Sequence, residues 1–290
     1  ISTDELIIPK EKISNKNDIE NQLRFFLLDH GFYEVINSPF VSYNSDDSIK
    51  IDNPLDSNKE YLRTNIIDSL LENLIFNERR QKDSIKLFEI SDIYIKKDHE
   101  IKKIRKLGII ASGRVGHNHK EFSKNINIKY LTEKFHNELP NQDFNFEVLN
   151  RKNLNTKIKN EIVISEVDID RFSPEVLNYN HNSKPPKDFN QYFPISDLPY
   201  SKRDLSFSIK DYSSCETLKE YIMGFKDKLL KEVFIFDYFY NEKNAEIKIG
   251  FRFVFQSADS TITEKQVNNI LGVIINRTEN IKGVTIPGLK

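Results

Sequence analysis

The fold of this chain is decided by residues 246–255, which read Glu246-Ile247-Lys248-Ile249-Gly250-Phe251-Arg252-Phe253-Val254-Phe255. Every second residue from Ile247 to Phe255 is apolar, with Lys248, Gly250 and Arg252 between them. Successive side chains of a β-strand point to opposite faces, so this alternation predicts a strand with one buried face and one open face. The same alternation recurs at 204–209, where Leu205, Phe207 and Ile209 fall between Asp204, Ser206 and Ser208.

An apolar stripe at helical spacing follows each of these two strands in the sequence. One consists of Leu218, Tyr221, Ile222 and Phe225, and the other of Val267, Ile270, Leu271, Ile274 and Ile275. The segment Thr263–Gln266 has the spacing of a capping box before the second stripe. From Phe193 onward the chain therefore predicts strand, helix, strand, strand, helix, strand. That order is the ferredoxin-like split βαββαβ arrangement, a common RNA-binding scaffold.

A family resemblance rests on short motifs whose order and spacing cover most of the chain. They are Asn53-Pro54-Leu55, Leu62-Arg63-Thr64, Leu87-Phe88-Glu89-Ile90, Phe193-Pro194, Leu198-Pro199, Arg203-Asp204-Leu205, Phe236-Asp237, Phe255-Gln256-Ser257 and Thr261-Ile262-Thr263. With them the chain resembles the C-terminal part of the bacterial phenylalanyl-tRNA synthetase β subunit. The resemblance implies an α+β fold: an inactive, antiparallel-sheet class II synthetase-like module at 1–187, then a ferredoxin-fold anticodon-binding domain at 188–290. The Pro-containing segment 181–186 is the expected boundary.

The first part of the chain predicts an antiparallel sheet with helices against it. Helices are expected at 18–29, after Thr64 and at 126–139, with Gly31 ending the first and Thr64 capping the second. Strands are expected at 32–41, 85–95, 106–112 and 162–167. The layout of 18–39 resembles the first signature motif of class II synthetases, which lies at a subunit interface. An ordinary amphipathic helix packed on a sheet is the alternative.

The sequence predicts no catalytic residue of its own. Class II synthetases hold the phosphates of ATP with arginines, because a guanidinium is planar, permanently charged and bidentate. The matching strand, 87–90, has no Arg-x-Glu, and no Gly-rich segment leading to an arginine precedes Pro185. We interpret Gly113–Gly116 as a turn between strands, and His117-Asn118-His119 as a surface loop rather than a metal site. The chain is therefore expected to hold no metal or cofactor itself.

RNA is expected on the open face of the C-terminal sheet, where aromatic rings and polar groups meet unpaired bases. Alternation places Ser206 and Ser208 there on one strand, and Lys248 and Arg252 on another. Residues 229–240 carry aromatic side chains in both registers, so alternation does not decide which of them are buried.

The resemblance also implies two contacts on the strand at 229–240. The family's Phe-Asp-x-Tyr motif falls on 236–239 and implies that Asp237 and Phe239 face the anticodon. Phe239 replaces the usual tyrosine, which keeps ring stacking and removes a hydroxyl, and Tyr240 could substitute if a bulge shifts the register. The alternative is that Phe239 packs against a neighbouring domain.

Composition sets the broad class. The chain has 290 residues, 38% hydrophobic and 11% aromatic, enough for two folded domains. Its single cysteine, Cys215, excludes an internal disulfide, and no apolar run approaches the length of a membrane span, which favours the cytoplasm. The net charge is −1, and residues 191–290 carry 14 Lys and Arg against 13 Asp and Glu. Charge therefore gives no independent support for RNA binding.

The resemblance implies partners and cofactors beyond this chain. They are a catalytic α subunit, tRNA-Phe and a second β subunit in an α2β2 tetramer, with ATP and Mg²⁺ used by the assembled enzyme. One alternative is a single-chain organellar-type synthetase with its own active site, which the missing arginines oppose. Another is a module whose two domains serve only assembly.

Overall fold

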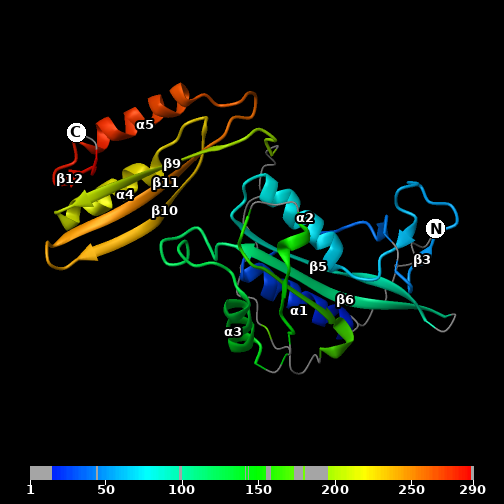
Figure 1. The fold of residues 1–290 in the computed structure, drawn as a ribbon. Helices are drawn as coiled ribbons and strands as arrows, with labels where there is room; N and C mark the ends of the chain where they lie inside the picture. Colours follow the sequence, from blue (N-terminus) through cyan, green and yellow to red (C-terminus); the bar gives the residue numbers. More distant parts are fainter. Residues whose placement is uncertain are drawn as a thin grey trace, which may run out of the picture. The chain divides into compact units, whose positions relative to one another are not determined.

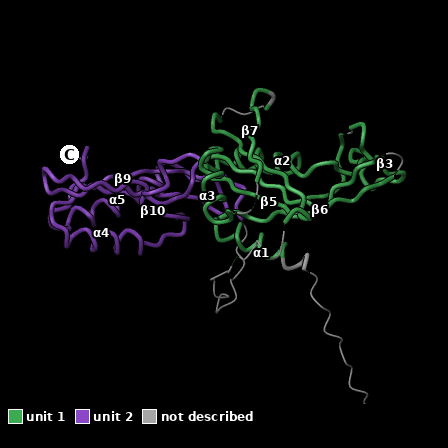
Figure 2. Tube along the Cα trace, turned by 90° about the horizontal axis from the view of Figure 1, so that it is seen from below, with its two compact units in different colours: residues 1–113, 126–185 green, residues 114–125, 186–290 purple. Residues whose placement is uncertain are grey.

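The computed structural model describes residues 15–43, 45–97, 100–140, 142, 144–154, 158–172, 179 and 195–288. The chain divides into two compact units, which Figure 2 colours separately. The N-terminal unit comprises residues 1–113 and 126–185, and the C-terminal unit comprises residues 114–125 and 186–290. The expected boundary segment, 181–186, lies outside the described residues, so the division at residue 187 stays a prediction.

A five-stranded sheet in the order β1-β5-β6-β8-β7 forms the centre of the N-terminal unit. Its strands are β1 (Tyr33–Glu34), β5 (Ser84–Lys97), β6 (Glu100–Gly113), β7 (Glu147–Leu149) and β8 (Ile162–Asp168). β1 runs parallel to β5, and the other neighbours are antiparallel. The three long predicted strands are confirmed. β6 begins earlier than predicted. Its first four residues are exposed, so no apolar alternation indicates that part of the strand.

Three helices accompany this sheet: α1 (Asn15–Asp29), α2 (Ile67–Arg79) and α3 (Ile128–Glu138). Figure 1 shows α2 on one side of β5 and β6, with α1 and α3 on the other. Leu70 and Leu74 of α2 belong to a buried cluster with Ile110 of β6. On the other side, the Phe26 and Phe135 rings meet edge to face, 5.1 Å between centroids. The three predicted helices are confirmed. No helix within the described residues is long and apolar enough to cross a membrane.

The helix ends confirm one prediction and correct another. Gly31 follows α1 with φ +76°, a left-handed conformation that glycine adopts without strain. Thr64 does not cap α2, because the helix begins only at Ile67 and its N-cap residue is Ile66. Asn65 Oδ1 instead accepts from the Asp68 backbone N–H at 2.9 Å.

A small antiparallel sheet in the order β2-β4-β3 completes the N-terminal unit. Its strands are β2 (Phe40–Val41), β3 (Ile49–Lys50) and β4 (Tyr61–Leu62), and two short 3₁₀ helices lie at η1 (Arg151–Asn153) and η2 (Ile169–Arg171). The strand expected at 32–41 is therefore present only as the two-residue pieces β1 and β2. Between them, the backbone N–H and the side-chain amide of Asn37 donate to the carboxylate of Glu89 in β5, and not to a backbone carbonyl as in a strand pair.

The C-terminal unit contains a four-stranded antiparallel sheet in the order β10-β11-β9-β12. Its elements, drawn in Figure 1, are β9 (Ser201–Ile209), α4 (Tyr212–Gly224), β10 (Leu230–Asn241), β11 (Glu246–Phe255), α5 (Glu264–Thr278) and β12 (Val284–Thr285). Both helices pack with Phe207, Ile249 and Phe251 in one buried cluster. This is the predicted ferredoxin-like order, and the α+β fold class is confirmed.

A bulge in β10 decides the register that the sequence left open. The pairing with β11 shifts between Ile235 and Asp237, so Phe236 is an extra residue on that strand. Val233, Ile235 and Tyr238 pack against the core, with two residues between the last pair instead of one. Such a bulge moves every later side chain to the opposite face, which a period-two pattern does not predict.

Replacing Thr263 with alanine tests the predicted capping box of α5. Thr263 Oγ1 accepts from the Gln266 backbone N–H at 3.3 Å, and Gln266 Oε1 accepts from the Thr263 backbone N–H at 2.9 Å. Losing this cap is expected to destabilise the C-terminal unit by about 1 kcal/mol. Amide hydrogen exchange in α5 measures the change. Thr263→Ser should behave like the unaltered chain, and equal exchange in the alanine and serine variants would contradict the prediction.

Candidate nucleic-acid interface

The face of the C-terminal sheet opposite α4 and α5 presents three rows of side chains across β10, β11 and β9. Residues paired across antiparallel neighbours share a face, so each row follows from the register. The first row is Phe234, Arg252 and Asp204, the second is Asp237, Gly250 and Ser206, and the third is Phe239, Lys248 and Ser208. All six residues that the sequence analysis named therefore lie on one face, in adjoining rows.

Four of these six side chains are exposed. Phe239 is 55% exposed, a large fraction for an aromatic ring, and Asp237, Ser206 and Lys248 are also exposed. An exposed ring beside a cation and two short polar groups has the chemistry that unpaired bases require: stacking, charge and hydrogen bonding.

The other two named residues are already engaged by neighbouring side chains. Arg252 donates to both carboxylate oxygens of Asp204 at 2.7 Å, a bidentate pair that fixes the guanidinium plane. Ser208 is buried and donates to Glu246 Oε1. Both contacts lie between neighbouring strands, and side-chain alternation did not predict them.

Two further aromatic residues on this face, Phe234 and Phe236, were missed by the sequence analysis. Phe234 lies opposite Arg252, and the bulge brings Phe236 over Gly250. A Cβ at Gly250 would lie 2.8 Å from the Phe236 ring, so glycine leaves the space that the ring occupies. A glycine within a strand facing a stretch of aromatics was the available signal.

Residues 114–125, the 114–125 loop, belong to the same compact unit as this sheet. Phe122 is only 7% exposed, and its ring lies 5.7 Å from Phe234 and 5.6 Å from Phe236. The prediction that Gly113–Gly116 forms a turn between strands is wrong, since the segment leads from β6 through this loop to α3. The period-two pattern ends at Gly113 and does not specify the element that follows.

His117 and His119 occupy this loop, as predicted, and contact rings of β10. The His117 ring stacks on Phe234 at 5.0 Å, and the His119 ring lies 5.6 Å from Tyr238. Among the described residues, no three His, Cys, Asp or Glu side chains lie together in a way that could hold a metal ion.

Tyr238 faces the core side of β10 rather than the open face. Lys219 Nζ lies 5.6 Å from the centre of the Tyr238 ring. A hydrogen bond to Glu216 raises the pKa of Lys219, so the ammonium stays charged beside the ring.

In the N-terminal unit, the glutamate of 87–90 forms a buried ion pair. Glu89 and Arg63 are each 1% exposed, and Arg63 Nη2 donates to Glu89 Oε1 at 2.8 Å. Asn37 Nδ2 donates to Glu89 Oε2 at 2.8 Å, and Arg63 Nε donates to the Asp92 carbonyl at 3.3 Å. These contacts join β5 to the segments beside β2 and β4. Two nitrogens of the Arg63 guanidinium, Nε and Nη2, thus bond within the protein, and the third, Nη1, is buried without a hydrogen-bond partner among the described residues.

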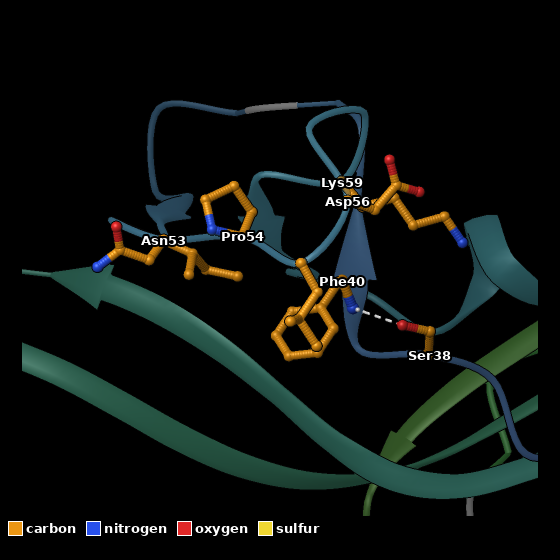
Figure 3. A pocket seen from close by; sticks show the side chains of 8 residues that line it. Ser38, Phe40, Asn53, Pro54, Asp56 and Lys59 are labelled. Atoms are coloured by element: carbon orange, nitrogen blue, oxygen red, sulfur yellow. Dashed lines mark hydrogen bonds between the residues drawn. The ribbon is translucent and has the colours of Figure 1, made fainter.

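The N-terminal unit also has an apolar pocket beside the small sheet, shown in Figure 3. Its volume is about 180 Å³, and it is lined by Ser38, Phe40, Ile51, Asn53, Pro54, Leu55, Asp56 and Lys59. Ser38 Oγ accepts from the Phe40 backbone N–H at 3.2 Å, and this is the bond drawn in Figure 3. The lining is mainly apolar, which suits an apolar group better than a phosphate.

Comparison with known families matches both parts of the chain. Residues 5–169 match the model described as phenylalanyl tRNA synthetase beta chain CLM domain. The chain belongs to the phenylalanyl-tRNA synthetase β-chain family. Residues 196–286 match the ferredoxin-fold anticodon binding domain, which contains all three rows described above.

Curated relatives agree with this family. The chain is 25% identical to a phenylalanine–tRNA ligase beta subunit of Carboxydothermus hydrogenoformans over 94% of this chain and 39% of the relative. It is 24% identical to that of Thermotoga maritima over 93% and 38%, and 25% identical to the chloroplastic subunit of Pyropia yezoensis over 89% and 40%. The chain thus spans about two fifths of the length of these relatives.

Proposed function

We propose that the C-terminal unit binds the anticodon region of tRNA-Phe, and that the N-terminal unit supports a separate catalytic α subunit of phenylalanyl-tRNA synthetase. The observation that carries this proposal is the group of four exposed side chains in the second and third rows of the sheet face. These rows place Phe239, Lys248, Asp237 and Ser206 side by side in the region matched by the anticodon-binding domain.

Each side chain has a distinct part in this proposal. Phe239 stacks on an anticodon base, and Lys248, its neighbour in the third row, attracts the phosphate between bases. Asp237 and Ser206 bond base edges from the second row. Arg252 and Ser208, which are held by Asp204 and Glu246, shape the surface around these contacts.

The assembled enzyme supplies the remaining parts. The curated relatives are named ligase beta subunits. On that basis the proposed partners of this chain are an α subunit, a second β subunit in an α2β2 tetramer, and tRNA-Phe. ATP and Mg²⁺ then belong to the assembled enzyme. A cytoplasmic location stays a prediction, because both bacterial and chloroplastic subunits are among the relatives.

The alternatives from the sequence are less well supported. The commitment of Arg63 to Glu89 and to the Asp92 carbonyl is evidence against a phosphate-binding role in a single-chain synthetase. A purely assembly role requires a partner surface over Phe239, which is 55% exposed within the matched anticodon-binding domain.

Replacing Phe239 with alanine tests the anticodon contact. The 290-residue chain should bind a tRNA-Phe transcript more tightly than the same transcript with a substituted anticodon. Phe239→Ala should reduce this preference by about tenfold, because stacking of one base on one ring contributes roughly 1–3 kcal/mol. Fluorescence anisotropy at one fixed salt concentration measures both affinities.

Two controls complete that experiment. Tyr212→Ala removes another exposed ring of the same unit, on α4 and 72% exposed, and should leave the preference unchanged. Phe239→Tyr keeps the ring and should retain the preference. If Phe239→Ala binds both transcripts like the unaltered chain, the anticodon role of this face is wrong and the assembly alternative is favoured.

A further inference from the structure

The 114–125 loop contacts the first row of the sheet face through the same groups that single-stranded RNA would use. His117 stacks on Phe234 with ring centroids 5.0 Å apart and planes within 10°. Phe122 lies against both Phe234 and Phe236, and the Arg252 guanidinium lies 4.7 Å from the centre of the Phe122 ring. Unpaired bases bind a protein surface through similar contacts, because their flat rings stack on aromatic side chains beside a cation.

Internal bonds hold the loop in this shape. The Val115 backbone N–H donates to the Lys124 carbonyl at 3.0 Å, and the Phe122 backbone N–H donates to the Asn118 carbonyl at 2.8 Å. Arg114 also lies 4.0 Å from the centre of the Phe122 ring. A loop that is ordered by its own bonds loses less conformational freedom when it covers a surface.

From this geometry we infer that the 114–125 loop is an internal occupant of the aromatic surface. It covers Phe234 and Phe236 and thereby confines RNA to the second and third rows, around Phe239. The loop sets the edge of the RNA interface and prevents unpaired RNA of any sequence from stacking along all three rings. This role rests on the proposed function only in placing RNA on this face of the sheet.

Phe122→Ala tests whether the loop is held on the sheet. Trypsin requires a mobile segment, and Lys120 and Lys124 are exposed cleavage sites within the loop. Without the buried Phe122 ring, cleavage at these two lysines should become about tenfold faster or more. Phe76→Ala, which removes a 53% exposed ring of α2, is the control and should leave cleavage unchanged. Equal cleavage rates in Phe122→Ala and the unaltered chain would overturn the inference.

The second measurement is binding of a labelled oligouridylate of about 12 nucleotides, within the span that single-strand binders cover. Phe122→Ala should bind this RNA about tenfold more tightly or more, because Phe234 and Phe236 then become available for stacking. His117→Ala, which alters an exposed side chain and leaves the buried anchor intact, should show a smaller gain. Adding Phe234→Ala to Phe122→Ala should remove a large part of the gain, because only Phe236 of the two released rings then remains.

The outcomes separate this inference from the proposed function. Faster cleavage with unchanged or weaker oligouridylate binding in both loop variants would overturn it, whatever Phe239→Ala does to tRNA binding. A gain for oligouridylate supports it even if Phe239→Ala leaves anticodon preference unchanged, since oligouridylate contains no anticodon loop. Variants whose circular dichroism spectra match that of the unaltered chain are folded. If Phe122→Ala does not fold, the binding of oligouridylate by His117→Ala decides the result.

Discussion

Arg63→Met is expected to lower the free energy of unfolding of the N-terminal unit by about 3–5 kcal/mol, the largest stability effect that we predict for a single substitution. Glu89 is 1% exposed and receives bonds from Arg63 and Asn37. Removing the guanidinium leaves a buried carboxylate without its counter-charge, and the uncompensated desolvation destabilises the folded state. The contacts of β5 with the segments beside β2 and β4 should loosen together.

The measurement is hydrogen exchange resolved along the chain, because a protein of two units does not have a single unfolding transition. A matched control removes both charges: Arg63→Met with Glu89→Leu should recover part of the loss, since no buried charge then remains. Arg24→Ala removes a more exposed ion pair, with Glu34, and should cost less than about 1 kcal/mol. If the double variant loses as much as Arg63→Met, the buried charge is not the cause.

Gly113→Ala is expected to destabilise the N-terminal unit by roughly 3 kcal/mol or more. Gly113 ends β6 with φ +93°, which an alanine adopts only with strain. A Cβ there would also lie 2.2 Å from the Asp83 carbonyl oxygen, a backbone atom that cannot rotate away. The end of the β5–β6 pairing, where Gly113 lies opposite Ser84, must therefore shift.

Gly272→Ala is the matched control for this substitution. Gly272 lies inside α5, and a Cβ at this position meets no atom within 4 Å. Alanine there should stabilise the C-terminal unit by about 0.5–1 kcal/mol, because it favours the helix. Hydrogen exchange at increasing denaturant concentration measures the change in the free energy of unfolding of each unit in both variants. Equal effects at Gly113 and Gly272 would mean that neither φ nor the Asp83 contact governs the site.

Helices and strands were predicted correctly where the buried residues recur at a single period. The alternation in 246–255 predicted β11, and Thr263–Gln266 predicted the cap of α5. Prediction fails where two neighbouring residues offer the same local signal, or where the chain has no apolar period. The side chain of Asn65, and not that of Thr64, accepts from the first turn of α2, and the exposed start of β6 has no apolar period to recognise.

The candidate interface shows the same division. Ser206, Ser208, Lys248 and Arg252 share a face because β9 and β11 alternate regularly, and this was predictable. The bulge at Phe236 and the neighbouring residues that engage Arg252 and Ser208 were not, because each depends on which residue lies opposite. The RNA contacts of these residues stay predictions.

From its sequence alone, this protein's family, its α+β class and the order of its C-terminal strands and helices were determined, since motif spacing and apolar period are properties of the chain itself. Tertiary structure alone decided that Arg63 pairs with Glu89, that the 114–125 loop lies over Phe234, and that Phe239 remains exposed. Such contacts join residues far apart in the chain. Their free energies depend on distances and burial that no local pattern records.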